Sequence, residues 1–500
     1  MTAFYNNIVV FLVALVLCAY SWIFGGTMGP MLIPVMPWLA LLVLEGLLCF
    51  PQKHSAETTF EARTRVWSRL KKDPLTWVIL SFIIYLSIPF ANKGLCEICD
   101  NPLIAAGAKA APPLPFLPFC VNRTDHLGVF LWFVPTLVSV LAVKHALLKE
   151  GKRMLVHIVV WNGFLLAILG AVQSATGAKG PLWTDFGYGD TYFFSTFGYT
   201  NMAGDFFTTV FALGFGLWRR QLDDIEAELK QEGRDKLKQS HTFFWKKHYL
   251  LIPTVIAYFA AINTLSRASI MLVTLIALVM FVHTATCMLK KMSRARRFKA
   301  GVVGAFGLAL IVVFGIFAMP EDVQREVDTI NTSAVLNRMT GKGQYHVRVA
   351  TAIWKKHALF GVGGWGYCHF CIPEMTDKEL PCLQTVGGIN VHNDYLQFLV
   401  EHGAVGACFL LAIIVLIVMP IARQWGDLLK AARFMSPKQR PPLPLQVFVL
   451  PAPVFAILLA AVATLIHAFG DCPLRSPAIL SMLFVSLASM RGFMPTTRHV

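Results

Sequence analysis

Three basic side chains stand out because their chemistry suits a reaction at a phosphate-linked centre. Arg267 lies in the short segment LSRAS, Arg348 in YHVRVATAIW, and His392 at the start of HNDYLQFLVEHG. Arginine keeps its charge and binds phosphate through two parallel hydrogen bonds. A neutral imidazole near pH 7 accepts a proton from a hydroxyl group. Together these residues predict a site at which a hydroxyl attacks while a phosphate-containing group leaves.

Each of the three also has an ordinary structural interpretation. Arg267 could reach up to lipid headgroups, Arg348 could be a surface arginine, and His392 could simply pack. An arginine between two closely connected apolar segments is costly unless it faces a cavity or a partner, which favours a functional role for Arg267. Asn393 or Asp394 can cap a helix that begins after His392, which places the imidazole at a helix start facing the membrane surface.

A second group of ionisable residues accompanies these three. Asp394 and Glu401 are alternative bases, ranked below His392. The closing segment HAFGDCPLRSP contains His467, Asp471 and Arg475, which could bind a ligand or pair with one another. The residue types leave both interpretations open.

The glycine-rich turn from Gly361 to Gly366 satisfies the pattern GxGxxG. A dinucleotide site would need a strand before this pattern and a helix after it, whereas here a predicted helix precedes it. We therefore expect these glycines to allow a tight turn or a close approach to a ligand.

The elements that must position these residues are strongly apolar. Of 500 residues, 56% are hydrophobic and only 14% are charged, where a soluble protein would have about a quarter charged. Apolar runs long enough to cross a bilayer occur at about 5–23, 31–50, 74–91, 127–147, 154–174, 200–218, 248–265, 268–289, 300–319, 398–419, 446–467 and 476–491. The expected fold is all-α, a polytopic transmembrane bundle of about twelve helices.

Charge distribution assigns the two sides of the membrane. The alternate loops 51–73, 144–153, 219–247, 290–299 and 420–445, with the C-terminus, hold 31 of the 44 Lys and Arg residues. Such residues concentrate in cytoplasmic loops. We therefore expect both termini in the cytoplasm and the long segment 320–397, with short helices, on the outer side. The net charge of +16 is then mainly a topology signal, and membrane lipid rather than nucleic acid is the expected partner.

Cysteines divide in the same way. Of the eleven, four in apolar spans are expected to pack: Cys18, Cys49, Cys287 and Cys408. Two groups lie in outer segments, where disulfides are permitted, namely Cys96, Cys99 and Cys120, then Cys368, Cys371 and Cys382, with Cys472 as a further partner. Their pairing is left open. Neither zinc-finger spacing nor a carboxylate-rich cluster occurs in these segments, so we expect no metal and no cofactor.

Together these motifs resemble the O-antigen ligase and polymerase family of bacterial membrane glycosyltransferases. The matching pieces are the LSRAS turn, the R-x5-W helix from Arg348 with the glycines after it, HNDYLQ-x3-E-x-G from His392, and H-x3-D-x-P-L-R-x-P from His467. The resemblance covers residues 200–490, including the large outer loop 320–397. Residues 1–199 are then N-terminal transmembrane helices with outer loops, and 491–500 a cytoplasmic tail.

The resemblance implies an inverting, metal-independent glycosyl transfer on the periplasmic face of the bacterial inner membrane, by a helical bundle like that of GT-C glycosyltransferases. The donor would be a polyprenyl-diphosphate-linked glycan, and the acceptor a hydroxyl of lipid A–core, of another glycan or of a protein. Carried over to this sequence, Arg267 and Arg348 would bind the diphosphate and His392 would activate or orient the acceptor.

Other functions share part of this pattern. A polymerase or a protein O-oligosaccharyltransferase would need the same site, and only the ligase-like look of HNDYLQ and LSRAS favours a ligase. A lipid-linked glycan transporter would need ionisable residues in mid-membrane, where few occur apart from Glu45. A structural partner of an export complex would not need Arg and His gathered in the largest outer loop.

Overall fold

The computed structural model describes residues 7–93, 112–184, 193–232, 248–290, 345–376, 390–433 and 450–495, with residues 321, 324, 325 and 379. Across these ranges the chain forms helices, and the only β-type pairings described are two isolated bridges, Lys93 with Cys120 and Phe194 with Phe197. The predicted all-helical fold is confirmed for this part of the chain.

The helices follow one another along the chain in this order. The first half contains α2 (Ile8–Trp22), α3 (Gly29–Leu32), α4 (Met36–Cys49), α5 (Thr59–Lys72), α6 (Pro74–Ala91), α7 (Arg123–His145), α8 (Lys149–Ala175) and α9 (Thr200–Glu232). The second half contains α12 (Leu251–Asn263), α13 (Arg267–Lys290), α17 (Tyr345–Lys356), α18 (Gly366–Phe370), α19 (Asp394–Arg433), α20 (Ala452–His467) and α21 (Pro477–Ser489), with short 3-10 turns η8 (Pro473–Arg475) and η9 (Met490–Gly492) near the end.

Each predicted span except 300–319 coincides with a described helix, and 300–319 lies outside the described residues. Among the described residues, five helices are long and apolar enough to cross a membrane: Pro74–Ala91, Arg123–His145, Lys149–Ala175, Arg267–Thr286 and Asp394–Lys430. Five further apolar helices are shorter: Ile8–Trp22, Met36–Cys49, Leu251–Asn263, Ala452–His467 and Pro477–Gly492. The helical membrane architecture follows from this, while the count of about twelve spans stays a prediction.

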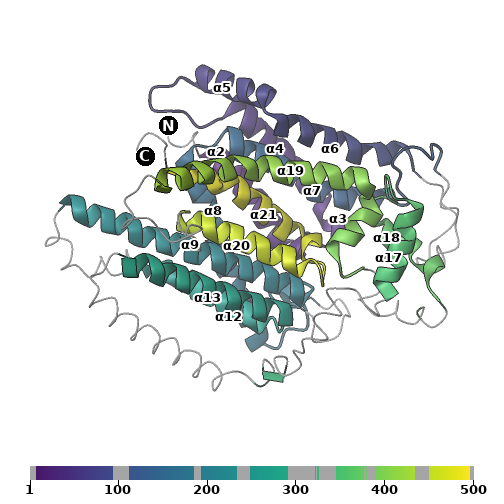
Figure 1. Ribbon diagram of the computed structural model, residues 1–500. Helices are drawn as coiled ribbons and strands as arrows, with labels where there is room; N and C mark the ends of the chain where they lie inside the picture. The colour runs from purple at the N-terminus through teal and green to yellow at the C-terminus, as the bar shows by residue number, and fades with distance from the viewer. Residues whose placement is uncertain are drawn as a thin grey trace.

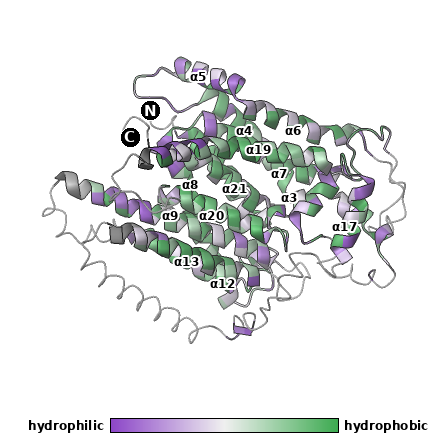
Figure 2. Ribbon diagram, viewed as in Figure 1, coloured by the Kyte–Doolittle hydropathy of each residue, from purple (hydrophilic) through white to green (hydrophobic). Residues whose placement is uncertain are grey.

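Burial separates a central helix from a peripheral one. In α7, 83% of the apolar window is buried inside the protein, whereas in α19 the share is 22%. A helix that is apolar on all sides and buried on all sides belongs at the centre of a bundle. Figure 1 shows α7, α8 and α21 surrounded by the other helices, and Figure 2 shows apolar residues covering the bundle, with hydrophilic residues gathered on α5, α17 and the far end of α9.

Helix starts follow signals in the sequence. Thr58 and Glu61 form a capping box at the start of α5, and the Asn122 carboxamide accepts the backbone N–H of Thr124 at 2.8 Å at the start of α7. The Asn393 carboxamide accepts the backbone N–H of Leu396 at 3.0 Å, so Asn393 caps α19. Such caps satisfy N–H groups that have no partner within the helix.

A break in α19 receives the glycine-rich turn. Gly403 has φ 60° inside α19, and this left-handed conformation strains any residue other than glycine. The backbone groups freed by this break bind the turn. Val362 N–H donates to Val400 O at 2.9 Å, and Gly363 N–H donates to Glu401 O at 2.9 Å. In return, the N–H groups of Ala404 and Val405 donate to the carbonyls of Ala358 and Leu359, which precede the turn. A Cβ on Gly361 would lie 2.5 Å from the Glu401 carbonyl carbon. Of the two alternatives expected from the sequence, a tight turn or a close approach to a ligand, these contacts fit the tight turn, which packs against α19.

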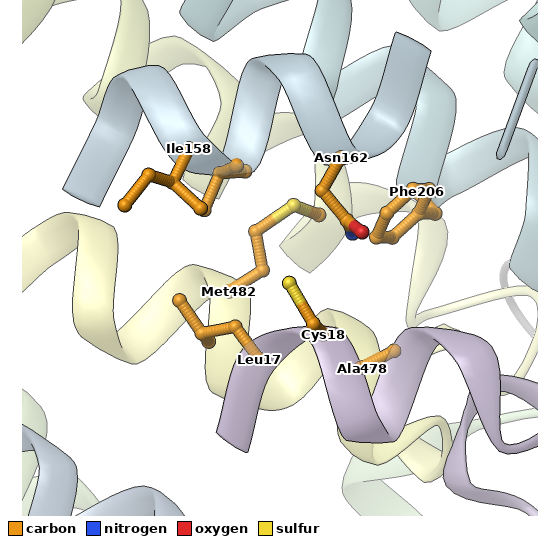
Figure 3. Close-up of a pocket in the computed structure, with 8 residues that line it drawn as sticks. Leu17, Cys18, Ile158, Asn162, Phe206, Ala478 and Met482 are labelled. Carbon is orange, nitrogen blue, oxygen red and sulfur yellow. The ribbon is translucent and has the colours of Figure 1, made fainter. Parts of the chain in front are cut away.

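A small space lies inside the bundle, between α2, α8, α9 and α21 (Figure 3). Leu17, Cys18 and Met482 line it together with Asn162. The Asn162 carboxamide accepts Trp22 Nε1–H at 2.9 Å and donates to Ser21 Oγ at 2.9 Å. Because its polar groups are satisfied and the remaining lining is mostly apolar, we interpret the space as a packing gap.

Candidate active site

His392 lies in the short segment that precedes α19 and adopts a left-handed backbone conformation, with φ 52°. Its imidazole Nδ1 is 3.3 Å from Asp471 Oδ1, in the turn between α20 and α21. The imidazole is 17% exposed and the carboxylate 4%. The structure therefore joins two candidate residues that are far apart in the sequence.

Donors from several elements surround the Asp471 carboxylate. The Tyr199 hydroxyl is 3.0 and 3.1 Å from its two oxygens. The Asn201 amide donates to Oδ2 and, at 2.7 Å, to the Tyr199 oxygen. The backbone N–H of Cys472 donates to Oδ1 at 2.8 Å. With the imidazole these donors stabilise a negative charge on Asp471.

This arrangement determines which imidazole nitrogen is basic. A carboxylate beside Nδ1 favours the tautomer in which Nδ1 carries the proton and donates it to Asp471. Nε2 of His392 is then the nitrogen that accepts a proton. A histidine oriented by a buried, hydrogen-bonded carboxylate is the usual arrangement of a general base in hydroxyl chemistry.

A second histidine faces the first. The ring of His346, in the first turn of α17, lies 5.7 Å from the His392 ring in an edge-to-face arrangement. Burial, followed by the nearby His392, lowers the pKa of His346 from 6.5 to about 4. His346 is therefore neutral at neutral pH, and its buried Nδ1 has no hydrogen-bond partner among the described residues.

Arg348 lies two residues further along α17. Its guanidinium forms an ion pair with Glu379, and Nη2 donates to the Glu374 carbonyl at 3.2 Å. Glu379 also acts electrostatically on His346, so this ion pair lies beside the histidine pair. The Arg348 side chain is 49% exposed. A phosphate group could reach it by replacing Glu379.

Arg267 is the first residue of α13 and is exposed. The start of α13 packs directly against the start of α9, because a Cβ on Gly204 would lie 2.2 Å from Ser269 Oγ. Since Tyr199 and Asn201 lie at that same start of α9, Arg267 belongs to the same end of the bundle as His392. A helix N-terminus adds partial positive charge there.

Two of the secondary candidates, Asp394 and His467, form contacts that hold neighbouring helices together near the site. The backbone N–H of Asp394 donates to Ala468 O at 2.9 Å, and its carboxylate accepts the Leu474 N–H at 2.8 Å. His467 Nδ1 is 3.1 Å from Asp205 Oδ1, and both side chains are buried. These contacts fix the start of α19 and the end of α20 to their neighbours.

Glu401 and Arg475 form a second buried pair. Arg475 Nη1 donates to Glu401 Oε2 at 3.1 Å, and Gln397 donates to Oε1 of the same carboxylate at 3.1 Å. The guanidinium also lies 4.2 Å above the Trp365 ring and 5.4 Å from that of Trp132, which is favourable cation–π geometry. Each ionisable residue of the closing segment therefore has a partner. Asp471 pairs with His392 of the candidate site, whereas His467 pairs with Asp205 of α9 and Arg475 with Glu401 of α19.

Four residues of this region are not among those predicted from the sequence: Tyr199, Asn201, Asp205 and His346. Asp205 carried a usable signal, because an ionisable side chain within a predicted span usually has a specific partner. Tyr199 and Asn201 carried none, since polar residues before a helix are common. His346 lies two residues before Arg348 but is not predicted as a site residue.

Within the described residues, one group could hold a metal ion. The ligand atoms of His392, Asp471 and Cys472 lie within 4.8 Å of one another, and imidazole, carboxylate and thiolate are all zinc ligands. Burial raises the pKa of the Cys472 thiol well above its ordinary value, which disfavours the thiolate that a metal requires. The same three residues therefore fit a hydrogen-bonded pair with a neutral thiol beside it.

No disulfide joins the cysteines of this region that the structure describes, which are Cys120, Cys368, Cys371 and Cys472. The other outer-segment cysteines, Cys96, Cys99 and Cys382, lie outside the described residues, so the predicted staples stay a prediction. Burial raises the pKa of Cys371 to about 11, so this thiol stays protonated at neutral pH.

Residues 252–413 match the family model described as O-antigen ligase. Over this segment the chain is similar to O-antigen ligases. Members of this family are membrane glycosyltransferase-like enzymes of the ligase or polymerase type, in line with the helical membrane architecture. Arg267, Arg348 and His392 lie within the matched segment of this O-antigen ligase domain, whereas Tyr199 and Asp471 lie outside it. No curated protein sequence matches the chain.

Proposed function

We propose that this chain transfers a glycan from a polyprenyl diphosphate to an acceptor hydroxyl, as an O-antigen ligase, at the end of the bundle that carries His392. The observation that supports this most is the His392–Asp471 pair, held by donors from α9 and from the turn before α21. In the proposed step the acceptor oxygen attacks the anomeric carbon, and its proton moves to His392 Nε2. The bond from that carbon to the diphosphate oxygen breaks, and polyprenyl diphosphate leaves.

The leaving group gains negative charge as this bond breaks, and fixed positive charge stabilises it. Arg348 and Arg267 are the proposed donors, both exposed at the same end as His392. Two arginines bind a diphosphate without a metal ion because each can form parallel hydrogen bonds. A single direct displacement inverts the anomeric centre, which gives the proposed inverting, metal-independent mechanism.

Membrane topology supports a periplasmic site. Among the described basic segments, α5 and the end of α9 lie at the end of the bundle opposite the start of α19 (Figure 1), and segments rich in Lys and Arg face the cytoplasm. We therefore propose that the protein lies in the bacterial inner membrane with both termini cytoplasmic. A donor lipid could then lie between helices with its diphosphate at the outer surface, level with His392.

The test is genetic. The gene is deleted in the source bacterium, the surface glycolipids are separated on a gel, and the deletion strain is complemented with wild type, His392→Ala or His54→Ala. His54 is an exposed histidine at the opposite end of the bundle and serves as the matched control.

For a ligase, deletion removes polymer from lipid A–core and leaves it on the lipid carrier, and only His392→Ala fails to restore the wild-type pattern. Lipid A–core carrying a single repeat would instead indicate a polymerase, and lost protein glycosylation a protein glycosyltransferase. Full complementation by His392→Ala, with normal amounts of protein in the membrane, would contradict a glycosyltransferase and favour a transporter or a scaffold.

A further inference from the structure

Basic side chains gather at the opposite end of the bundle, where α5, α8 and η9 meet. The start of α7 binds α18 through Asp125 and His369 at 3.0 Å, and its 23 residues then run about 34 Å away from that end. Beyond the far end of α7, Lys152 lies near the start of α8 and is only 8% exposed. η9 packs directly on Lys152, since a Cβ on Gly492 would lie 2.8 Å from the Lys152 Cβ. Arg491 of η9 and Arg69 of α5 are exposed and act on Lys152 electrostatically. We call Lys152, Arg69 and Arg491 the basic cluster.

Neighbouring cations in this region have partners. Lys144 forms an ion pair with Asp73 at 2.7 Å, and Arg65 forms one with Glu57 at 2.7 Å. Arg153 Nε donates to the Gly492 carbonyl at 2.8 Å. For the basic cluster itself, the described part of the chain provides neither an ion pair nor a side-chain hydrogen bond.

This arrangement is electrostatically unfavourable in the isolated protein. Like charges that lie close together repel one another, and among the described residues no counter-ion balances Lys152. Here the charges that act on Lys152 most strongly are Arg491, Arg69 and Lys144, all of the same sign. Donors on three neighbouring cationic side chains, one mostly buried and two exposed, suit a phosphate group.

The side chains around the basic cluster indicate which kind of phosphate-containing molecule would bind there. Exposed aromatic side chains of α5 and α6 lie in the same region, with Phe60 77%, Trp67 47% and Trp77 53% exposed. Trp side chains concentrate at the headgroup level of a membrane, and a helix with aromatic and basic residues such as α5 lies in the interface plane. We infer that the basic cluster binds the phosphate headgroup of an anionic phospholipid in the leaflet at this end. Basic pockets between transmembrane helices on the cytoplasmic side are known to bind such headgroups.

The full-length protein is purified into nanodiscs of phosphatidylcholine, with or without phosphatidylglycerol, and its thermal unfolding is measured. Lys152→Gln removes the buried charge, and Lys152→Arg keeps it. Lys430→Gln removes an exposed lysine of α19 and is the matched control for loss of one charge. Native mass spectrometry from detergent then gives the affinity for phosphatidylglycerol. Inorganic phosphate, added to nanodiscs without phosphatidylglycerol, tests for a soluble anion instead of a lipid.

We expect phosphatidylglycerol to raise the unfolding temperature of wild type, Lys152→Arg and Lys430→Gln, but not of Lys152→Gln. The last variant should bind phosphatidylglycerol about fivefold more weakly, the effect of one charge near a membrane surface. Without phosphatidylglycerol, Lys152→Gln should be at least as stable as wild type, because it removes an uncompensated charge. Equal stabilisation of Lys152→Gln by phosphatidylglycerol would overturn the inference, and so would an equal effect of inorganic phosphate. These outcomes do not depend on the proposed glycosyl transfer.

Discussion

Asp471→Asn is the substitution that tests most directly how the candidate site is organised. The asparagine keeps the shape of the side chain, and its amide oxygen can still accept from His392 Nδ1 and from the Cys472 N–H. The negative charge is lost. When His392 accepts the acceptor proton it becomes an imidazolium, and in wild type the carboxylate 3.3 Å from Nδ1 stabilises that charge.

The size of the effect follows from the geometry. Two unit charges about 4 Å apart attract by roughly 1 kcal/mol in bulk water and 4 kcal/mol at an effective dielectric constant of 20. The imidazole is 17% exposed and the carboxylate 4%, so the environment lies between these limits. We therefore expect kcat to fall about 10²-fold, with little change in KM for the lipid-linked donor, because Asp471 stabilises only the transition state.

The assay uses purified protein in nanodiscs, a lipid-linked glycan donor and an acceptor lipid, with kcat and KM measured separately. Asp427→Asn is the control, since Asp427 is an exposed carboxylate on α19 whose ion-pair partner in the described part of the chain is Lys430, at 3.8 Å. Tyr199→Phe removes a single donor to the Asp471 carboxylate and should cost about tenfold in kcat. A folded Asp471→Asn protein with kcat within about threefold of wild type would refute the argument that this carboxylate orients and stabilises His392.

Further predictions concern the residues around this pair. Arg475→Met leaves Glu401 buried and unpaired, so the free energy of unfolding should fall by about 3–5 kcal/mol in denaturant titration, and adding Glu401→Gln should restore most of it. Arg348→Gln should raise KM for the donor at least about tenfold, since one charge-assisted contact to the diphosphate is lost. An unchanged KM for the donor would contradict the assignment of Arg348 to the diphosphate site. The depressed pKa of His346, about 4 against 6.5, means that the native state binds fewer protons than the unfolded state between those values. Stability should therefore fall as the pH drops through this window, and His346→Gln should flatten that dependence in thermal unfolding at pH 7 and pH 5. Treatment with a chelator, and Cys472→Ser, should each leave transfer unchanged, whereas loss of activity in both would point to a metal held by the His392 group.

The sequence predicted the helices well because their signals are local. Apolar runs, capping residues such as Asn393 and Thr58, and the separation of Lys and Arg by loop each act within a few residues. The His392 segment was recognised for the same reason, since cap, apolar face and terminating glycine lie within one short stretch. The order of importance, with His392 above Asp394 and Glu401, stays a prediction; both carboxylates are buried, Asp394 beside the Leu474 N–H and Glu401 beside Arg475.

The pairings across the bundle could not be predicted in the same way. Asp471 contacts Tyr199 and His392 only because α9, α19 and α20 converge at one end of the bundle. No periodic pattern in the sequence predicts these contacts. For this reason the residue types alone leave open whether Asp471 and Arg475 bind a ligand or pair with other residues. The glycine-rich turn shows the same limit, since its tight geometry was expected but its partner, the break in α19 at Gly403, is set by packing.

The central claim is that His392 accepts the acceptor proton during transfer from a polyprenyl diphosphate. The most direct test is single-turnover transfer by purified protein in nanodiscs, with labelled lipid-linked glycan and acceptor, comparing wild type with His392→Ala and His54→Ala. The claim predicts that His392→Ala binds the donor with unchanged affinity but transfers at least about 10²-fold more slowly, and that His54→Ala behaves as wild type. Transfer by His392→Ala at the wild-type rate, with the protein folded and the donor bound, would contradict it.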